Sequence, residues 1–272
     1  MSSPTPACSR RPAGETLGLA GDTVDNTGGK IEATASSTVQ LQGTTVTAGS
    51  AITTLGGVIE ALAGGPSTLN LAALTNAGRI QADSGAALAN GATAKAAANS
   101  GVVEAVSGGV VTLAGAVANK GNLWANGGAL TVGGAVTGTG AETISGGVLT
   151  LNGAVAATQT VTFAAGTSGA LDLGHAQTFA GTVAGLAAGD TIDLQNFHFS
   201  GAPTISAVTG TGAVGTTVGV TIKDGAASAT IHLLVQYAGQ FATSASGYSL
   251  TSDNPGSPST AGTLFQLAPP GG

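Results

Sequence analysis

The chain has 272 residues, of which 42% are hydrophobic, only 7% are charged and 3% are aromatic, and its formal net charge is −6. Helical domains cover their exposed faces with Glu, Lys, Arg and Leu, but here Gly, Ala, Thr, Ser and Asn must cover the surface, which predicts an all-β fold. The lack of a basic patch argues against nucleic acid as a partner, and no apolar run reaches the roughly 20 residues that a transmembrane helix needs.

Residues 1–21 form a polar, proline-containing segment that we expect to be disordered. The segment shows no apolar stretch of the kind that marks a signal peptide. Its lone Cys8 has no second cysteine with which to form an intrachain disulfide.

Residues 22–165 contain an internal repeat. The phrase Asn-x-Gly-x-aliphatic-x-Ala appears as "NAGRIQA", "NSGVVEA" and "NKGNLWA", and two looser forms precede it. The aliphatic positions of these copies are Ile31, Ile59, Ile80, Val103 and Leu123. Their recurrence within the range of known repeat lengths indicates turns of a solenoid.

A second phrase alternates with the first and reads "GGVVTLAGAV", "GGALTVGGAV" and "GGVLTLNGAV", with evenly spaced starts at Gly108, Gly127 and Gly146. Its alternation of aliphatic and small residues is typical of a strand with one buried face. Stacked turns would place Val111, Leu130 and Leu149 in one buried column at about 4.8 Å spacing. Together the phrases predict a parallel β-helix with turns of about 20 residues and two short strands per turn.

The small polar residues of the repeat have expected roles as well. The Gly-Gly pairs supply the positive φ values of the corners. The Asn that opens each first phrase either forms a left-handed corner bonded to its own backbone or stacks in an amide ladder between turns.

The two phrases resemble the repeats of filamentous-haemagglutinin-like and autotransporter-type bacterial adhesins. The likeness covers residues 22–165 and implies a right-handed parallel β-helix in a secreted or surface-exposed bacterial protein, as part of a larger repeat protein.

The two repeated sequence phrases do not continue into residues 166–272, and we expect this region to form a small antiparallel β cap. The stretch "VGVTIKDGAASATIHLLVQY" predicts a hairpin around Asp224 and Gly225. A tail rich in proline and glycine follows, with one strand predicted at Thr263 to Leu267. The region resembles the modules that close large secreted bacterial repeat proteins, and a cap would protect the last open strand edges.

One predicted column carries acidic groups. The residues that directly follow the buried aliphatic positions should line one outer face. They are Glu32, Glu60, Gln81, Glu104 and Trp124. Adjacent carboxylates about 5 Å apart would match a retaining glycosidase pair, so the column is the basis of an alternative function as a polysaccharide-active enzyme. The simpler interpretation is a solvated face with Trp124 half-buried at its end.

Thr112, Thr131 and Thr150 recur at the even spacing of the second phrase and should form a short outward row of hydroxyl groups. Such a row could contact a glycan or ice, but three threonines are a small array, and we expect no arrest of ice growth. Asp190 and Asp193 give the nearest approach to a calcium-binding repeat, yet they occur once, and we interpret them as turn and strand-edge residues. We expect no metal and no cofactor.

These observations favour a non-enzymatic structural or adhesive module of a secreted or cell-surface bacterial protein. Its expected partners are glycans or proteins of a host or matrix surface. The alternatives are the polysaccharide-active enzyme and the glycan- or ice-binding solenoid.

Overall fold

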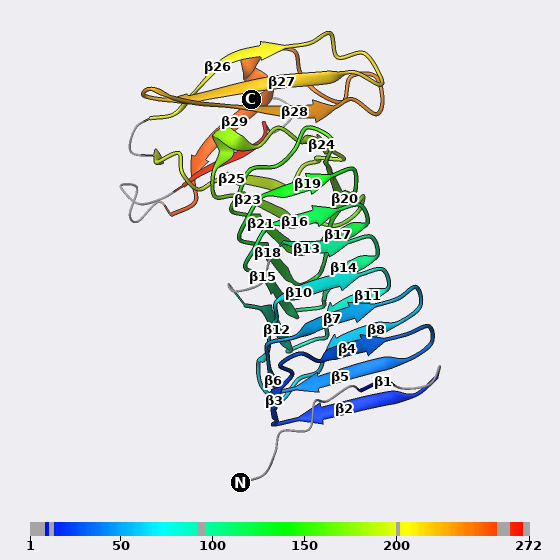
Figure 1. Cartoon of the computed structure of the whole chain (residues 1–272). Helices are drawn as coiled ribbons and strands as arrows, with labels where there is room; N and C mark the ends of the chain where they lie inside the picture. Colours follow the sequence, from blue (N-terminus) through cyan, green and yellow to red (C-terminus); the bar gives the residue numbers. More distant parts are fainter. Residues whose placement is uncertain (1–8, 11–13, 92–95, 200–201, 255–261, 269–272) are drawn as a thin grey trace.

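The chain folds into stacked coils of β-strands, an all-β parallel solenoid of about eight turns, as predicted (Figure 1). The computed structural model describes residues 9–10, 14–91, 96–199, 202–254 and 262–268. Two short 3₁₀ turns, η1 (Ala176–Thr178) and η3 (Ala245–Gly247), lie wholly within the described residues.

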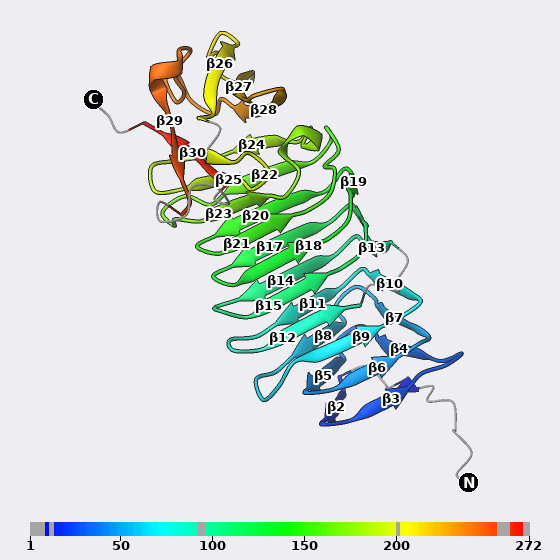
Figure 2. The same cartoon turned by 90° about the vertical axis from the view of Figure 1, so that its left-hand side faces the viewer.

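Three sheets run along the rod, so most turns contribute three strands and not the two expected (Figure 2). Sheet A has seven strands in the order β1 (Ser9–Arg10), β4 (Lys30–Ala33), β7 (Ser50–Thr53), β10 (Ala73–Asn76), β13 (Ala97–Asn99), β16 (Val117–Asn119) and β19 (Val136–Gly138). Sheet B has twelve in the order β2 (Thr16–Ala20), β5 (Thr38–Gln42), β8 (Val58–Ala61), β11 (Arg79–Ala82), β14 (Val102–Val106), β17 (Asn122–Asn126), β20 (Ala141–Ser145), β22 (Thr160–Phe163), β24 (Thr182–Ala184), β28 (Ala227–Leu234), β27 (Thr217–Asp224) and β26 (Thr204–Thr209). Sheet C has eleven in the order β29 (Tyr248–Ser252), β30 (Thr263–Leu267), β25 (Thr191–Leu194), β23 (Ala170–Leu173), β21 (Val148–Leu151), β18 (Ala129–Val132), β15 (Val110–Leu113), β12 (Ala87–Asn90), β9 (Ser67–Asn70), β6 (Thr45–Thr47) and β3 (Thr23–Asp25).

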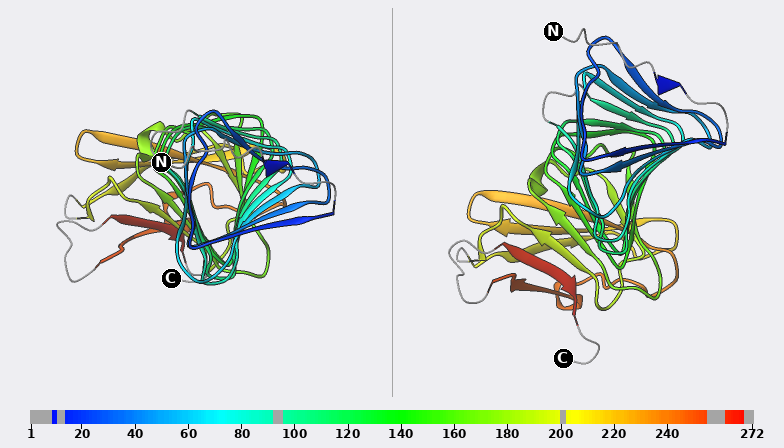
Figure 3. Two further views of the ribbon diagram at one scale, coloured as in Figure 1. Left: turned by 60° about the horizontal axis from the view of Figure 1, so that its bottom comes forward. Right: turned by 90° about the horizontal axis from the view of Figure 1, so that it is seen from below.

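The core consists of aliphatic columns inside the coil. Figure 3 shows the backbone of this coil from the side of its N-terminal end. Val111, Leu130 and Leu149 are register partners on successive strands of sheet C, and each is fully buried. Each turn therefore buries its inward face partly against the turns above and below it, as the repeat predicted.

The column inside sheet B contains Val39, and not Ile31, in the turn before Ile59. Val39 is the register partner of Ile59, whereas Ile31 lies in sheet A beside Ala51. The assignment of Ile31 to this column was wrong because a strand of any sheet shows the same alternation of buried and exposed residues.

Asparagines form a ladder inside sheet A. Asn76 Nδ2 donates to Asn99 Oδ1 at 2.8 Å, and Asn99 Nδ2 donates to Asn119 Oδ1 at 2.8 Å. All three side chains are buried. Of the two roles considered for these asparagines, the structure has the amide ladder, and Asn119 Oδ1 in addition accepts from the nearby backbone N–H of Gly121 at 3.2 Å.

The Gly-Gly corners need both of their glycines. Gly127 has a φ of +70°, which is unfavourable for other residues. A Cβ on Gly128 would lie 2.5 Å from the carbonyl oxygen of Gly109 in the preceding turn. The first glycine therefore allows the corner, and the second allows successive corners to stack.

The solenoid is longer at both ends than the range of 22–165. Strand β2 lies within the segment 1–21 expected to be disordered and pairs with β5. Strands β23 and β25 continue the parallel pairing of sheet C to Leu194, and β24 continues that of sheet B. Leu171 and Ile192 are register partners that continue the buried column, so the period persists where the phrasing changes.

Antiparallel strands complete the C-terminal end, beyond the last solenoid turn (Figures 1 and 2). Strands β27 and β28 form the predicted hairpin around Asp224 and Gly225, and β30 is the predicted strand Thr263–Leu267. Strand β28 pairs with β24 and β30 pairs with β25, so both edges of the last turn are occupied. Parts of the proline- and glycine-rich tail, 255–261 and 269–272, lie outside the described residues.

Candidate functional site

The outer column of sheet B differs from the predicted one in its first member. Register pairing places Gln40, Glu60, Gln81, Glu104 and Trp124 in one file on β5, β8, β11, β14 and β17. Glu32 lies instead in sheet A, where its carboxylate forms an ion pair with Lys30 at 3.0 Å. The predicted grouping of Glu32 with Glu60 and Glu104 was therefore wrong.

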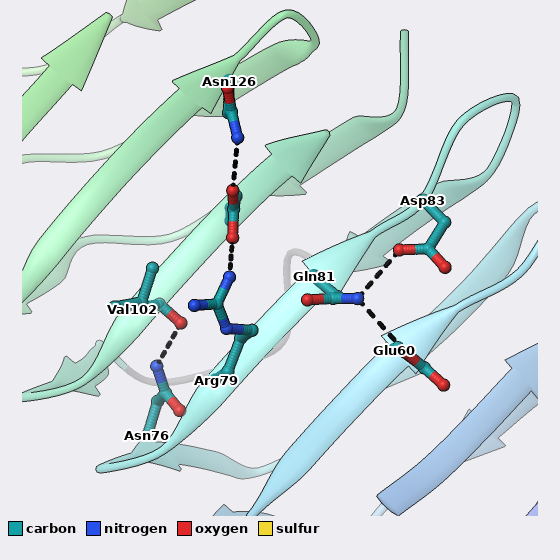
Figure 4. A network of polar contacts seen from close by, with 8 residues as sticks. Glu60, Asn76, Arg79, Gln81, Asp83, Val102 and Asn126 are labelled. Carbon is teal, nitrogen blue, oxygen red and sulfur yellow. Dashed lines mark hydrogen bonds and ion pairs between the residues drawn. The ribbon is translucent and has the colours of Figure 1, made fainter. Parts of the chain in front are cut away.

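Glu60 is held by amides on both neighbouring strands, and Figure 4 shows the one from Gln81. Gln40 Nε2 donates to Glu60 Oε1 at 2.7 Å, and Gln81 Nε2 donates to Oε2 at 3.1 Å. Gln81 Nε2 also donates to Asp83 Oδ1 at 2.8 Å. Both Glu60 oxygens thus accept hydrogen bonds from the protein.

Glu104 is buried, in contrast to the solvated position expected for it, with 2% of its surface exposed. Arg79 Nη1 donates to Glu104 Oε2, and Asn126 Nδ2 donates to Oε1 at 2.7 Å, so the two side chains point at one carboxylate (Figure 4). Two donors compensate for removing the charge from water. On the next strand Trp124 is half-buried, and its Nε1 has no hydrogen-bond partner among the described residues.

Sheet C carries a file of threonines that is longer than predicted. Thr112, Thr131 and Thr150 are register partners, as their spacing indicated. Toward the N-terminal end, the same file continues through Ala89, Thr68, Thr45 and Thr23. The six threonines therefore extend from the first strand of sheet C to Thr150, with one alanine among them.

The face around this file is uncharged over six turns. The six strands from β6 to β21 in sheet C contain no Asp, Glu, Lys or Arg. On β12, β15, β18 and β21, the outward position two residues before the file carries Ala or Val, including Val110 and Val148, which are 40% and 37% exposed. The face thus presents hydroxyl and methyl groups on a rigid surface.

The threonine file ends in carboxylates that the sequence pattern did not group. Thr150 is followed by Asp172 and then Asp193, and Thr150 Oγ1 donates to Asp172 Oδ2 at 3.2 Å. Burial, followed by the charges of Asp172 and Asp253, raises the pKa of Asp193 to about 7. Burial is also the main cause of the raised pKa of Asp172.

Asp190 has different hydrogen-bond partners from the aspartates of the outer file. Asp190 accepts backbone hydrogen bonds from Gly169 at 3.0 Å and from Ala187 at 2.9 Å, as a turn residue does. Within the described part of the chain, no group of three or more His, Cys, Asp or Glu side chains is arranged to hold a metal ion.

A buried acid, Glu142, occupies the inward column of sheet B between Leu123 and Val161. Its Oε1 accepts from Asn119 Nδ2 at 3.1 Å, while Oε2 has no partner among the described residues. Burial raises the pKa of Glu142 to about 7. The burial of this residue was not predicted from the sequence, although its position one full repeat after Leu123 indicated that it would point inward.

No protein-family model matches the chain, and no curated protein matches its sequence. None of the helices in the described ranges is long and apolar enough to cross a membrane.

Proposed function

We propose that the chain is a non-enzymatic structural and adhesive module of a secreted or cell-surface bacterial protein, and that the outer face of sheet C binds a neutral glycan surface. The single observation that carries the proposal is the threonine file on an uncharged face. The resemblance of the repeat to bacterial adhesins supports the assignment of the module and its location.

The chemistry of the face suits a neutral ligand with many hydroxyl groups. Threonine hydroxyls both donate and accept hydrogen bonds, and the threonine methyl groups contact the apolar faces of sugar rings. Each contact is weak, but many contacts on one rigid surface act together and need little ordering on binding.

The acids of sheet B support a structural role better than a catalytic one. Glu60 is bound by two amides, and Glu104 is buried in an ion pair with Arg79. A general acid or nucleophile must instead reach the substrate. Hydrolysis of a polysaccharide that is lost in Glu60→Gln would replace the proposed function by the enzymatic alternative.

The experiment is a sedimentation assay with microcrystalline cellulose as the neutral polysaccharide. Thr131→Tyr places a ring in the middle of the file and should weaken binding by about tenfold. Thr137→Tyr is the matched control because Thr137 is exposed on sheet A. Absence of binding by the parent chain, or equal binding by the two variants, would reject this surface.

The length of the file also favours ice as a second candidate ligand. The sequence pattern indicated three threonines, and the structure aligns six. Thermal hysteresis in the parent chain that disappears in Thr131→Tyr would support ice recognition.

A further inference from the structure

The two ends of the rod differ in whether further strands pair with the edges of the solenoid sheets. At the C-terminal end, β28 and β30 pair with the last solenoid strands. At the other end, β2 and β3 are the terminal strands of sheets B and C among the described residues. Such an edge offers backbone donors and acceptors to a further strand.

From this edge we infer that the chain self-associates head to head, through antiparallel pairing of β2 with the same strand of a second copy. The inference is independent of the proposed glycan binding. It rests on the direction of the backbone groups, on the side chains of β2 and on their order along the strand.

Alternate residues of β2 direct their backbone groups to the free edge. The carbonyl of Glu15 accepts from Thr38 N, and Gly21 N donates to Gln42 O. The backbone N–H and C=O groups of the odd-numbered residues therefore point toward β5. Alternation then directs the backbone groups of Thr16, Gly18 and Ala20 away from β5. The N–H of Ala20 already donates to Asp22 Oδ2 at 3.2 Å, which leaves Gly18 as the centre of the free edge.

The order of residues in β2 is self-complementary about Gly18. A two-fold axis at this residue pairs Gly18 with Gly18 of the partner subunit and Thr16 with Ala20 of the partner subunit. All of these residues direct their backbone groups outward, so the register is the one an antiparallel hydrogen-bonded pair requires. A two-fold interface of this kind closes at two copies and does not grow into a filament.

The side chains fit the same register. Leu17 and Leu19 are half-buried and pack against the core, and each would meet the other leucine across the axis. The apolar column of sheet B would then continue from one copy into the next. Glu15 and Asp22 would each lie opposite a glycine, at Gly21 and Gly14, so no acid faces an acid directly.

Analytical ultracentrifugation of the full chain tests the inference, with Gly18→Pro and Gly18→Ala as a matched pair. Proline removes the outward N–H without breaking a bond to β5 and should raise the dimer dissociation constant by about tenfold or more. Alanine keeps the N–H, and a Cβ at Gly18 has no atom within 4 Å, so this variant should remain dimeric.

Cross-linking gives a second, geometric readout. In a Cys8→Ser background, Gly18→Cys should form a disulfide between two copies, because the Cα atoms of a hydrogen-bonded pair lie about 5.5 Å apart. Thr137→Cys on sheet A should not. A monomeric parent chain, a dimer insensitive to Gly18→Pro, open-ended filaments, or equal cross-linking at both positions would each overturn the inference.

Discussion

Asn76 donates a hydrogen bond from its side-chain Nδ2 to the side-chain Oδ1 of Asn99, one turn further along the solenoid, and both side chains are buried. The bond joins two turns inside the rod, where no water competes for it. It belongs to the ladder that extends through Asn119.

Truncation of this ladder should destabilise the chain. Asn99→Ala removes the acceptor of Asn76 and the donor of Asn119, and it should lower the free energy of unfolding by about 1–3 kcal/mol. Thr75→Ala, an exposed change on the adjacent strand β10, should alter it by less than about 0.5 kcal/mol. Urea denaturation measures both, and equal midpoints would contradict a structural role for the ladder.

Leu130 and Thr131 test the direction of the side chains in sheet C. Leu130 is fully buried between Val111 and Leu149, so Leu130→Asp should cost more than the roughly 2–5 kcal/mol of a Leu→Ala truncation. Thr131→Asp places its charge on the outer face and should cost far less. Denaturant midpoints of the two variants compare the costs, and similar losses would mean that the register is wrong.

Glu142 should make stability depend on pH. Its pKa is raised by burial from 4.5 to about 7, so between these values the folded chain binds more protons than the unfolded chain. The stabilising contribution of the neutral carboxyl is complete below pH 4.5 and is lost as pH rises to 7. The loss amounts to about 3 kcal/mol.

The variant Glu142→Gln isolates this contribution because the amide oxygen can still accept from Asn119. Other acids with raised pKa values act in the same direction, so the difference between parent and variant is the relevant quantity. We expect urea denaturation from pH 4 to 8 to show a smaller decline for the variant. Parallel curves would contradict the burial of an ionisable group at this position.

The carboxylates at the end of the threonine file should weaken the attachment of β29 and β30 at high pH. Burial raises the pKa of Asp193 to about 7, and Asp253 from the C-terminal segment adds to the shift. The favourable neutral form is therefore lost as pH rises through 7. Asp193→Asn should increase hydrogen-exchange protection of Thr263–Leu267 at pH 8 and leave it unchanged at pH 4, after correction for intrinsic exchange rates.

Asp253→Asn is the milder companion variant because it removes one neighbouring charge and leaves the buried carboxyl in place. Its gain in protection at pH 8 should be smaller than that of Asp193→Asn. Protection that does not respond to either change would show that the acids do not act on this segment.

The repeat period predicted the solenoid and the partners of Thr131 because equivalent positions of successive turns must stack on one another. It did not predict which sheet a strand enters. "KIEA" at residues 30–33 and "VIEA" at 58–61 have the same alternation, so Glu32 was grouped with Glu60. The interval from Ile31 to Ile59 is longer than the intervals that follow it, and it was the signal that a strand of another sheet had been included.

The carboxylate cluster and the buried acid were harder to predict. Asp172 and Asp193 replace threonine in the outer file, and this change made the last turns look like the end of the repeat. Glu142 stands where every other turn has an aliphatic residue, and its environment depends on Asn119 from another strand. Such contacts follow from three-dimensional packing and not from local pattern.

The stacked glycine corners and register-matched columns also allow the rod to change length in whole turns. Val117 and Val136 are register partners one full turn apart, so excising residues 117–135 would join Ala116 to an equivalent strand start. Every column and the outer threonine file would keep its order across the junction. Duplication or loss of such a unit during evolution would set the reach of the rod in steps of about 4.8 Å without redesign of its core.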